Sequence, residues 1–123
     1  MVIDWLSYGV DADSAEFWDR YNKASKRSID RENASEKVTD DAENIRAYCA
    51  SFREFYKDLI GEENAGELLK DVGDNKREMD SVYESLLSCI YQQKMESRKR
   101  MASILIKYAP KRKQEESHDT STV

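Results

Sequence analysis

The sequence predicts an all-α protein, a small helical bundle of about four helices with a long C-terminal helix and a short extended N-terminal lead-in. Its 123 residues contain four glycines and one proline, so turn signals are too sparse for a sheet of short strands. Hydrophobic residues make up 39% of the chain and recur at spacings of three and four, as on one face of a helix. We expect one helical domain over residues 1–110 and a disordered charged tail over residues 111–123, which lacks apolar periodicity.

The N-terminal part is predicted as an extended or irregular lead-in over residues 1–10, broken at Gly9 and followed by a first helix. Asp11 to Ser14 supply several N-caps for that helix. It is predicted to end near Lys26 to Arg31, because the stretch 27–41 is polar and aperiodic, as in a loop or a frayed helix end. Its helical stripe consists of Ala15, Phe17, Trp18, Tyr21 and Ala24.

The second helix has the strongest apolar stripe in the sequence. Thr39, Asp40 and Asp41 predict its start, because a hydroxyl caps free backbone amides and carboxylates oppose the helix dipole. Gly61 is placed to end it. The stripe consists of Ile45, Tyr48, Cys49, Phe52, Phe55, Tyr56, Leu59 and Ile60, and the core is expected to include Phe52, Phe55, Tyr56 and Leu59.

Two further helices are predicted. A shorter one covers Glu63 to Val72 and is closed by Gly73. Asn75 then begins N-K-R-E, which places Glu78 as the acid of a capping box, and no glycine or proline follows before Pro110. A helix of this length measures on the order of 50 Å, more than the ~30 Å width of a small domain, so part of it must project or bend.

The final helix carries two apolar patches separated by the polar run QQKMESRKR. The first consists of Met79, Val82, Tyr83, Leu86 and Ile90, and the second of Met101, Ile104, Leu105, Ile106 and Tyr108. Monomers rarely leave a large apolar patch exposed, so the second patch either folds back or meets another chain. We therefore expect partner binding or self-association, and a homo-oligomer, through Met101, Ile104, Leu105 and Tyr108.

Charge is unevenly distributed along the chain, whose formal net charge is −5. Residues 1–93 hold 12 basic and 21 acidic side chains, a balance of −9, whereas residues 94–113 hold eight and one, a balance of +7. Clustered cations can release phosphate counterions, but no nucleic-acid recognition motif accompanies them. The basic run is interpreted as exposed to solvent or facing a partner, and nucleic-acid binding is the less favoured interpretation. The run consists of Lys94, Arg98, Lys99, Arg100, Lys107, Lys111, Arg112 and Lys113.

The sequence predicts no catalysis, cofactor or metal site. It has no Gly-rich phosphate loop, H-E-x-x-H motif, nucleophile elbow or cysteine pair at zinc spacing. Cys49 and Cys89 fall on apolar stripes, where free cysteine behaves as a small hydrophobe. With His118 they are too few for a metal site, and adjacent acids such as Glu62 and Glu63 are more often solvated or capping groups.

The chain also lacks a sequence signal for export or membrane insertion. Its start, MVIDWLSYGVDAD, has no charged beginning and no apolar run of signal-peptide length. No stretch approaches the ~18 apolar residues of a membrane span. We expect a cytoplasmic protein without membrane contact.

A succession of short motifs covers the chain except residues 28–38 and the last ten. It consists of Tyr8 to Asp13, Ile45-Arg46-x-x-Cys49, Leu59 to Glu62, Ala65 to Leu69, Gly73 to Lys76, and Lys107 to Arg112. In this order the motifs resemble small proteins of phages and prophages of Gram-positive bacteria, the siphophage tail assembly chaperones. The chain departs from that family in its shorter, less strand-like start and in Ile60, where a second aromatic residue is usual before the glycine.

The resemblance implies a non-catalytic helper, made in the bacterial host cytoplasm, that binds the tape measure protein or other tail proteins during tail morphogenesis. Such chaperones coat the long, helix-rich tape measure protein and give way as major tail protein polymerises around it. On this reading the second apolar patch contacts the client. The residues that steer its acidic helices are Lys94, Arg98, Lys99, Arg100 and Lys107.

Two other functions remain alternatives. A small DNA-associated or regulatory protein of a mobile element would use residues 94–113 as its phosphate footprint, and its DNA binding would depend steeply on salt. A structural component would remain in the virion. The last residues, Ser121 to Val123, have the form of a carboxylate ligand for a sheet edge, or of an unstructured end.

Overall fold

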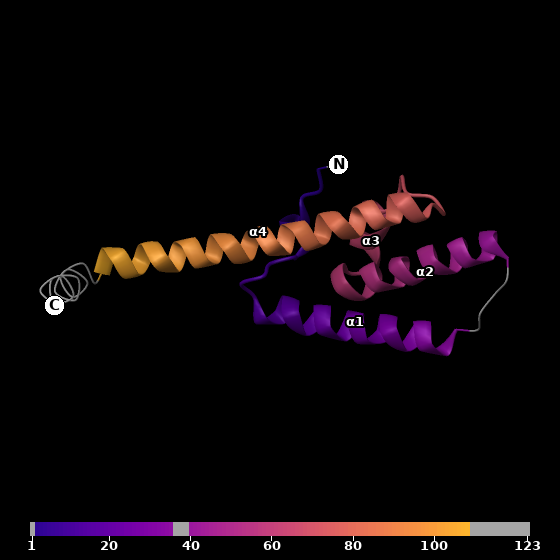
Figure 1. The fold of residues 1–123 in the computed structure, drawn as a ribbon, viewed down its shortest axis with the longest axis horizontal. Coiled ribbons are helices and arrows are strands. Elements are labelled where there is room, and N and C mark those ends of the chain that lie inside the picture. Colours follow the sequence, from indigo (N-terminus) through magenta and orange to yellow (C-terminus); the bar gives the residue numbers. More distant parts are fainter. Residues whose placement is uncertain (1, 36–39, 109–123) are drawn as a thin grey trace, which may run out of the picture.

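The computed structural model describes residues 2–35 and 40–108, and this part of the chain is an all-α helical bundle without strands (Figure 1). The predicted fold class is confirmed, including the long C-terminal helix. The expected tail 111–123 and its last residues, Ser121 to Val123, lie outside the described residues. The elements are the 3₁₀ helix η1 (Trp5–Tyr8) and the helices α1 (Ala15–Ala34), α2 (Asp41–Ile60), α3 (Glu62–Leu68) and α4 (Lys76–Tyr108).

The lead-in is more regular than the sequence indicated, because it contains the single 3₁₀ turn η1. Gly9 ends this turn with a φ of 85°, the left-handed conformation that glycine adopts without a steric penalty. The turn buries Trp5, whose ring is 2% exposed, and the indole Nε1 donates a hydrogen bond to Ser85 Oγ on α4 at 2.9 Å. The lead-in therefore covers the core and is tied to the last helix.

α1 extends to Ala34, so the predicted end near Lys26 to Arg31 is wrong. Ser14, one of the predicted caps, is the N-cap residue. Arg27 and Arg31, in the stretch expected to be a loop, reach Asp58 of α2 at 3.3 and 3.5 Å. These ion pairs hold the last turns of α1 beside α2, and an apolar stripe alone cannot reveal them.

The caps of α2 and α4 follow the sequence prediction in most respects. Asp40 Oδ1 accepts a hydrogen bond from the Ala42 N–H at 2.9 Å, and Gly61 ends α2 with a φ of 90°. Asn75 Oδ1 accepts from the Glu78 N–H at 3.0 Å. The Glu78 carboxylate, however, accepts from the Gly73 N–H at 3.3 Å, so the reciprocal bond of a capping box reaches two residues further back. Thr39, the other predicted cap, lies outside the described residues.

α3 is shorter than the predicted Glu63 to Val72. It begins at Glu62 and ends at Leu68, and the chain then turns, with the Val72 N–H donating to the Leu69 carbonyl at 3.0 Å. Gly73 therefore does not end the helix.

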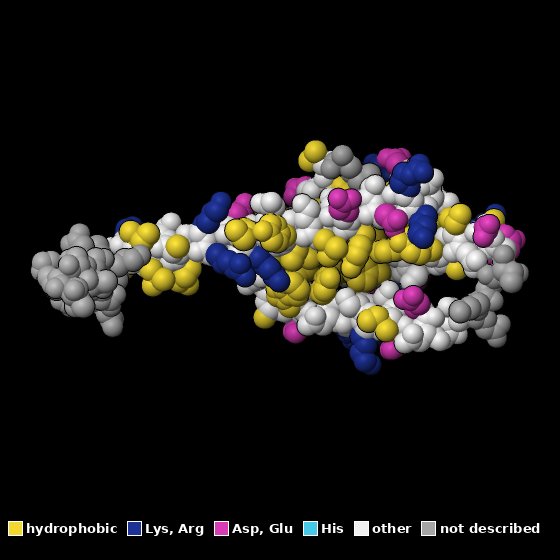
Figure 2. Space-filling view, viewed as in Figure 1, with side chains coloured by type: hydrophobic (Ala, Val, Ile, Leu, Met, Phe, Trp, Pro, Cys, Tyr) yellow, Lys and Arg dark blue, Asp and Glu magenta, His cyan; other side chains and the backbone are white. Residues whose placement is uncertain are grey.

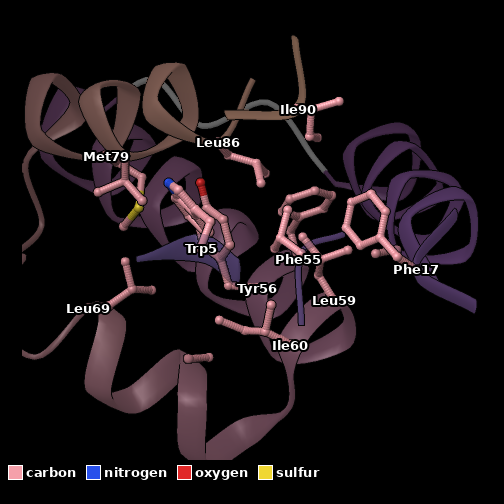
Figure 3. Close-up of a cluster of buried hydrophobic side chains, with 14 of the residues drawn as sticks. Trp5, Phe17, Phe55, Tyr56, Leu59, Ile60, Leu69, Met79, Leu86 and Ile90 are labelled. Atoms are coloured by element: carbon pink, nitrogen blue, oxygen red, sulfur yellow. The ribbon is translucent and has the colours of Figure 1, made fainter. Parts of the chain in front are cut away.

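One hydrophobic core joins η1, all four helices and the loop residue Val10. Its centre is Tyr56, which lies beside Trp5 in Figure 3, and the two ring centroids are 6.0 Å apart. Phe52, expected in the core, is half-buried, because it faces an open side of the bundle. The buried hydrophobic residues are Trp5, Val10, Phe17, Ala24, Cys49, Phe55, Tyr56, Leu59, Ile60, Ala65, Leu69, Met79, Val82, Leu86 and Ile90.

α2 is the central helix of the bundle: it contacts α1, α3 and α4, whereas α1 and α4 share few close contacts. Figure 1 shows α4 as one continuous rod whose C-terminal part extends past the other helices. A helix longer than the domain was expected either to project or to bend, and α4 projects. None of the helices in the described residues is long and apolar enough to cross a membrane.

Candidate interaction surfaces on the arm and the open face

The projecting part of α4, residues 98–108, is called the arm here. Every residue of the arm is exposed, and its large apolar side chains are exposed by between 44% at Ile104 and 74% at Tyr108. Within the described residues the second apolar patch therefore does not fold back onto the bundle. The apolar patch of the arm consists of Met101, Ile104, Leu105, Ile106 and Tyr108.

The polar run between the two patches of α4 fixes the helix to the lead-in. The Gln93 side chain donates from Nε2 to the Val10 carbonyl at 2.9 Å and accepts from the Ala12 N–H at 2.6 Å. The Ala12 carbonyl in turn accepts from Trp18 Nε1 at 2.9 Å. The Gln93 side chain thus pairs with a backbone carbonyl and a backbone N–H of the loop between η1 and α1, as a neighbouring backbone segment would. The sequence pattern indicates only a polar run between two apolar patches and does not reveal this role, because glutamine carries no apolar signal.

Three of the five predicted steering cations have partners within the chain. Lys94 Nζ lies 4.8 Å from the centre of the Trp18 ring, and Lys107 Nζ lies 5.4 Å from that of Tyr108. Arg100 pairs with Asp13 at 2.7 Å, and its hydrogen bond lowers the pKa of the Asp13 carboxyl. Among the described residues, Arg98 and Lys99 have no such contact. Lys94 and Arg100 thus connect α4, near the base of the arm, to Trp18 and Asp13.

A second apolar surface is a groove of about 230 Å³ on the side of the bundle where α1 and α4 stay apart. Figure 2 shows hydrophobic side chains gathered over this face between α4 and α1, and again near the C-terminal end of α4, with Lys and Arg side chains between. We call it the open groove; its lining residues are Ser25, Ser28, Ile29, Phe52, Phe55 and Tyr83.

The floor of the open groove is aromatic. The ring centroid of Tyr83 lies 5.3 Å from that of Phe52 and 6.2 Å from that of Phe55. Ile29, on the α1 side, is 57% exposed. It lies eight residues after Tyr21, two helical turns further on, and this spacing could have identified it although the stretch was expected to be a loop.

A wider depression lies between η1 and the end of α2, with a volume of about 530 Å³. Arg20 lines it, but its guanidinium donates to the Gly9 carbonyl at 3.1 Å and to the Leu59 carbonyl at 3.2 Å. These bonds connect the lead-in, α1 and α2, so Arg20 stabilises the fold here. Among residues 2–35 and 40–108, no group of three or more His, Cys, Asp and Glu side chains is placed to hold a metal ion.

The titratable groups with shifted pKa values belong mainly to the core and its edge. The Tyr48 hydroxyl donates to the Asp80 carboxylate, and this bond, with burial, raises the pKa of Tyr48 to about 12. Burial raises the pKa of the Cys49 and Cys89 thiols. A raised pKa leaves less thiolate at neutral pH.

Comparison with known proteins places the chain in a family. No curated protein and no solved structure matches the chain. The sequence model of one protein family matches residues 6–119, which include η1 from Leu6 onward and all four α-helices. The chain belongs to the family of unknown function DUF6673.

Proposed function

We propose that this protein is a non-catalytic tail assembly chaperone of a phage or prophage, which binds the tape measure protein in the host cytoplasm during tail morphogenesis. The observation that carries the proposal is the apolar patch exposed on the arm. The order of sequence motifs described above supports the choice of client. A rigid helix with an exposed apolar face suits a helix-rich client, because helix-on-helix contact buries apolar stripes reversibly.

The charge near the patch supports a protein partner. The arm holds Arg98, Lys99, Arg100 and Lys107 and no acidic residue. Cations beside an apolar surface speed encounter with acidic helices and disfavour basic ones. Arg98 and Lys99 make no ion pair or cation–π contact within the described residues, so no such contact competes with a partner for them.

DNA binding has weaker support. Three of the five steering cations pair within the chain, and Arg100 faces a carboxylate. A phosphate contact at Lys94, Arg100 or Lys107 would have to replace such a contact, and residues 1–93 have a charge balance of −9. A DNA-binding protein would lose affinity steeply as salt rises, so a mobility-shift titration between about 50 and 200 mM salt distinguishes the two functions.

The test is co-expression with the tape measure protein encoded in the same genome, followed by pull-down and size-exclusion chromatography with light scattering. We expect a soluble complex with several copies of this protein. The double variant Leu105→Glu, Tyr108→Glu should lose it, because two charged side chains would enter the apolar contact.

Leu6→Glu is the matched control, since Leu6 is 62% exposed on η1, outside both the arm and the open groove. The proposal is wrong if the wild-type protein forms no complex, or if the arm variant and the control bind equally well. Mass spectrometry of purified particles separates a chaperone, which is absent from them, from a structural virion component.

A further inference from the structure

The open groove leaves apolar side chains on one side of the bundle partly uncovered. α2 forms its floor, α1 and α4 form its sides, and the backbones of these two helices come close at few positions. Phe52 and Tyr83 are only half-buried, and Ile29 is exposed. An amphipathic helix lying in this groove would cover all three side chains.

The arm supplies an amphipathic segment with the correct orientation. Met101 lies 18 residues after Tyr83 on the same helix, which at 3.6 residues per turn is about five full turns. Ile104 stands in the same relation to Leu86 and Tyr108 to Ile90, both in the core, whereas Leu105 follows Leu87, which is 42% exposed. Met101, Ile104 and Tyr108 of the apolar patch therefore face the same side of α4 as the groove and the core.

The arm cannot enter the groove of its own chain. α4 is one uninterrupted helix from Lys76 to Tyr108, and it forms one side of that groove before it extends away (Figure 1). Folding the arm back would require breaking the helix and its backbone hydrogen bonds. An arm that enters this groove would therefore belong to another chain.

Charge indicates which surface of a second copy the arm prefers. The arm carries four basic side chains and no acidic one, whereas residues 1–93 have a balance of −9. Two arms in contact would repel each other, while an arm on the other copy's bundle is attracted. Asp80 and Glu84, both exposed, lie close to Tyr83 along the α4 edge of the groove.

We propose that the open groove is the docking site for the arm of a second copy of this chain. Because groove and patch lie on the same side of α4, two copies facing each other with antiparallel α4 helices can place each arm in the other's groove. The contact is then made twice around a two-fold axis, which closes the dimer. The patch can then meet a client only when the arm has left the groove, but this inference does not depend on the proposed chaperone function.

The test uses the purified full-length protein alone, with its mass measured by light scattering. Two variants each remove one half of the contact: Leu105→Glu, Tyr108→Glu in the arm, and Ile29→Arg in the groove. Ile29 is exposed, so its replacement leaves the core intact, and circular dichroism checks the helix content of each variant. We expect the wild-type protein and the control Leu6→Arg to be dimers, and both variants to be monomers.

Mixing the two variants gives the decisive result. The arm of the Ile29→Arg protein and the groove of the arm variant are both unchanged, so an equimolar mixture should form a heterodimer through one contact. Arm-to-arm association would give no such complementation. A monomeric wild-type protein, an Ile29→Arg variant that stays dimeric, or a mixture that stays monomeric would each overturn the proposal.

The same variants separate this inference from the proposed function. Ile29→Arg should lose the dimer and keep tape measure binding, because its arm is intact. A dimer without client binding would contradict the chaperone function alone. Client binding by a wild-type monomer would contradict the docking proposal alone.

Discussion

Gln93 on α4 accepts a hydrogen bond from the backbone N–H of Ala12 at 2.6 Å, across 81 positions of sequence. The same side chain donates to the Val10 carbonyl, so Gln93→Ala leaves two partly buried backbone groups without their partner. We expect the free energy of unfolding to fall by about 2 kcal/mol. Urea denaturation measures it, and the exposed neighbour Gln92→Ala is the control, expected within about 0.5 kcal/mol of wild type. Equal effects of the two substitutions would contradict the bridging role.

Leu86 and Ile104 are a matched pair on one helix face, 18 residues apart, one in the core and one on the arm. Leu86 is fully buried, so Leu86→Ala should lower the free energy of unfolding by about 3 kcal/mol. Ile104 is 44% exposed, and Ile104→Ala should change it by less than about 1 kcal/mol. Both are measured at low protein concentration, where association contributes least. Similar losses at the two positions would mean that the arm is part of the folded core.

The Tyr56 hydroxyl is buried and has no hydrogen-bond partner among the described residues. Burial also raises the pKa of Tyr56. Because an unpaired buried hydroxyl is destabilising, Tyr56→Phe should leave the free energy of unfolding unchanged or raise it by about 1 kcal/mol. Tyr48→Phe is the comparison, since it removes a hydroxyl that donates to Asp80, and should lower stability by about 1 kcal/mol. A marked loss in Tyr56→Phe would show that its hydroxyl has a partner.

Stability should decrease at alkaline pH. The pKa of Tyr48 is raised from 10.0 to about 12, and burial raises that of Cys49 above 9.0. The folded state therefore holds these protons more tightly than the unfolded chain does. Their stabilising contribution is complete below about pH 9 and is lost as pH rises from there through about 12.

Thermal denaturation at pH 8, 10 and 11 measures this dependence. Tyr48→Phe should show a shallower decrease, because one of the shifted groups is gone. An unchanged melting temperature across this range would contradict the shifts.

The sequence predicted those parts of the fold that local patterns encode. The apolar stripe of α2, the cap residues Asp40 and Asn75, and the stop at Gly61 could each be recognised within one helical turn. The polar end of α1 could not be recognised as helix, because Arg27 and Arg31 pair there with Asp58, which is 27 or more positions away.

The candidate surfaces were predicted to a similar extent. The patch on the arm could be found because α4 changes from polar to apolar at Met101. The open groove could not be predicted, because it depends on the separation of α1 and α4. No local pattern encodes the distance between two helices. The roles of Lys94 and Arg100 were also out of reach, because Trp18 and Asp13 are distant in sequence.

The continuity of α4 from Tyr83 to Met101 also fixes the spacing of the proposed dimer. Eighteen residues of helix hold the groove and the patch about 27 Å apart. Both copies carry the same spacing, so the second arm lies opposite its groove once the first contact has formed. The second contact therefore forms at a high effective concentration. A rigid helix of fixed length thereby determines which surfaces of two copies can meet.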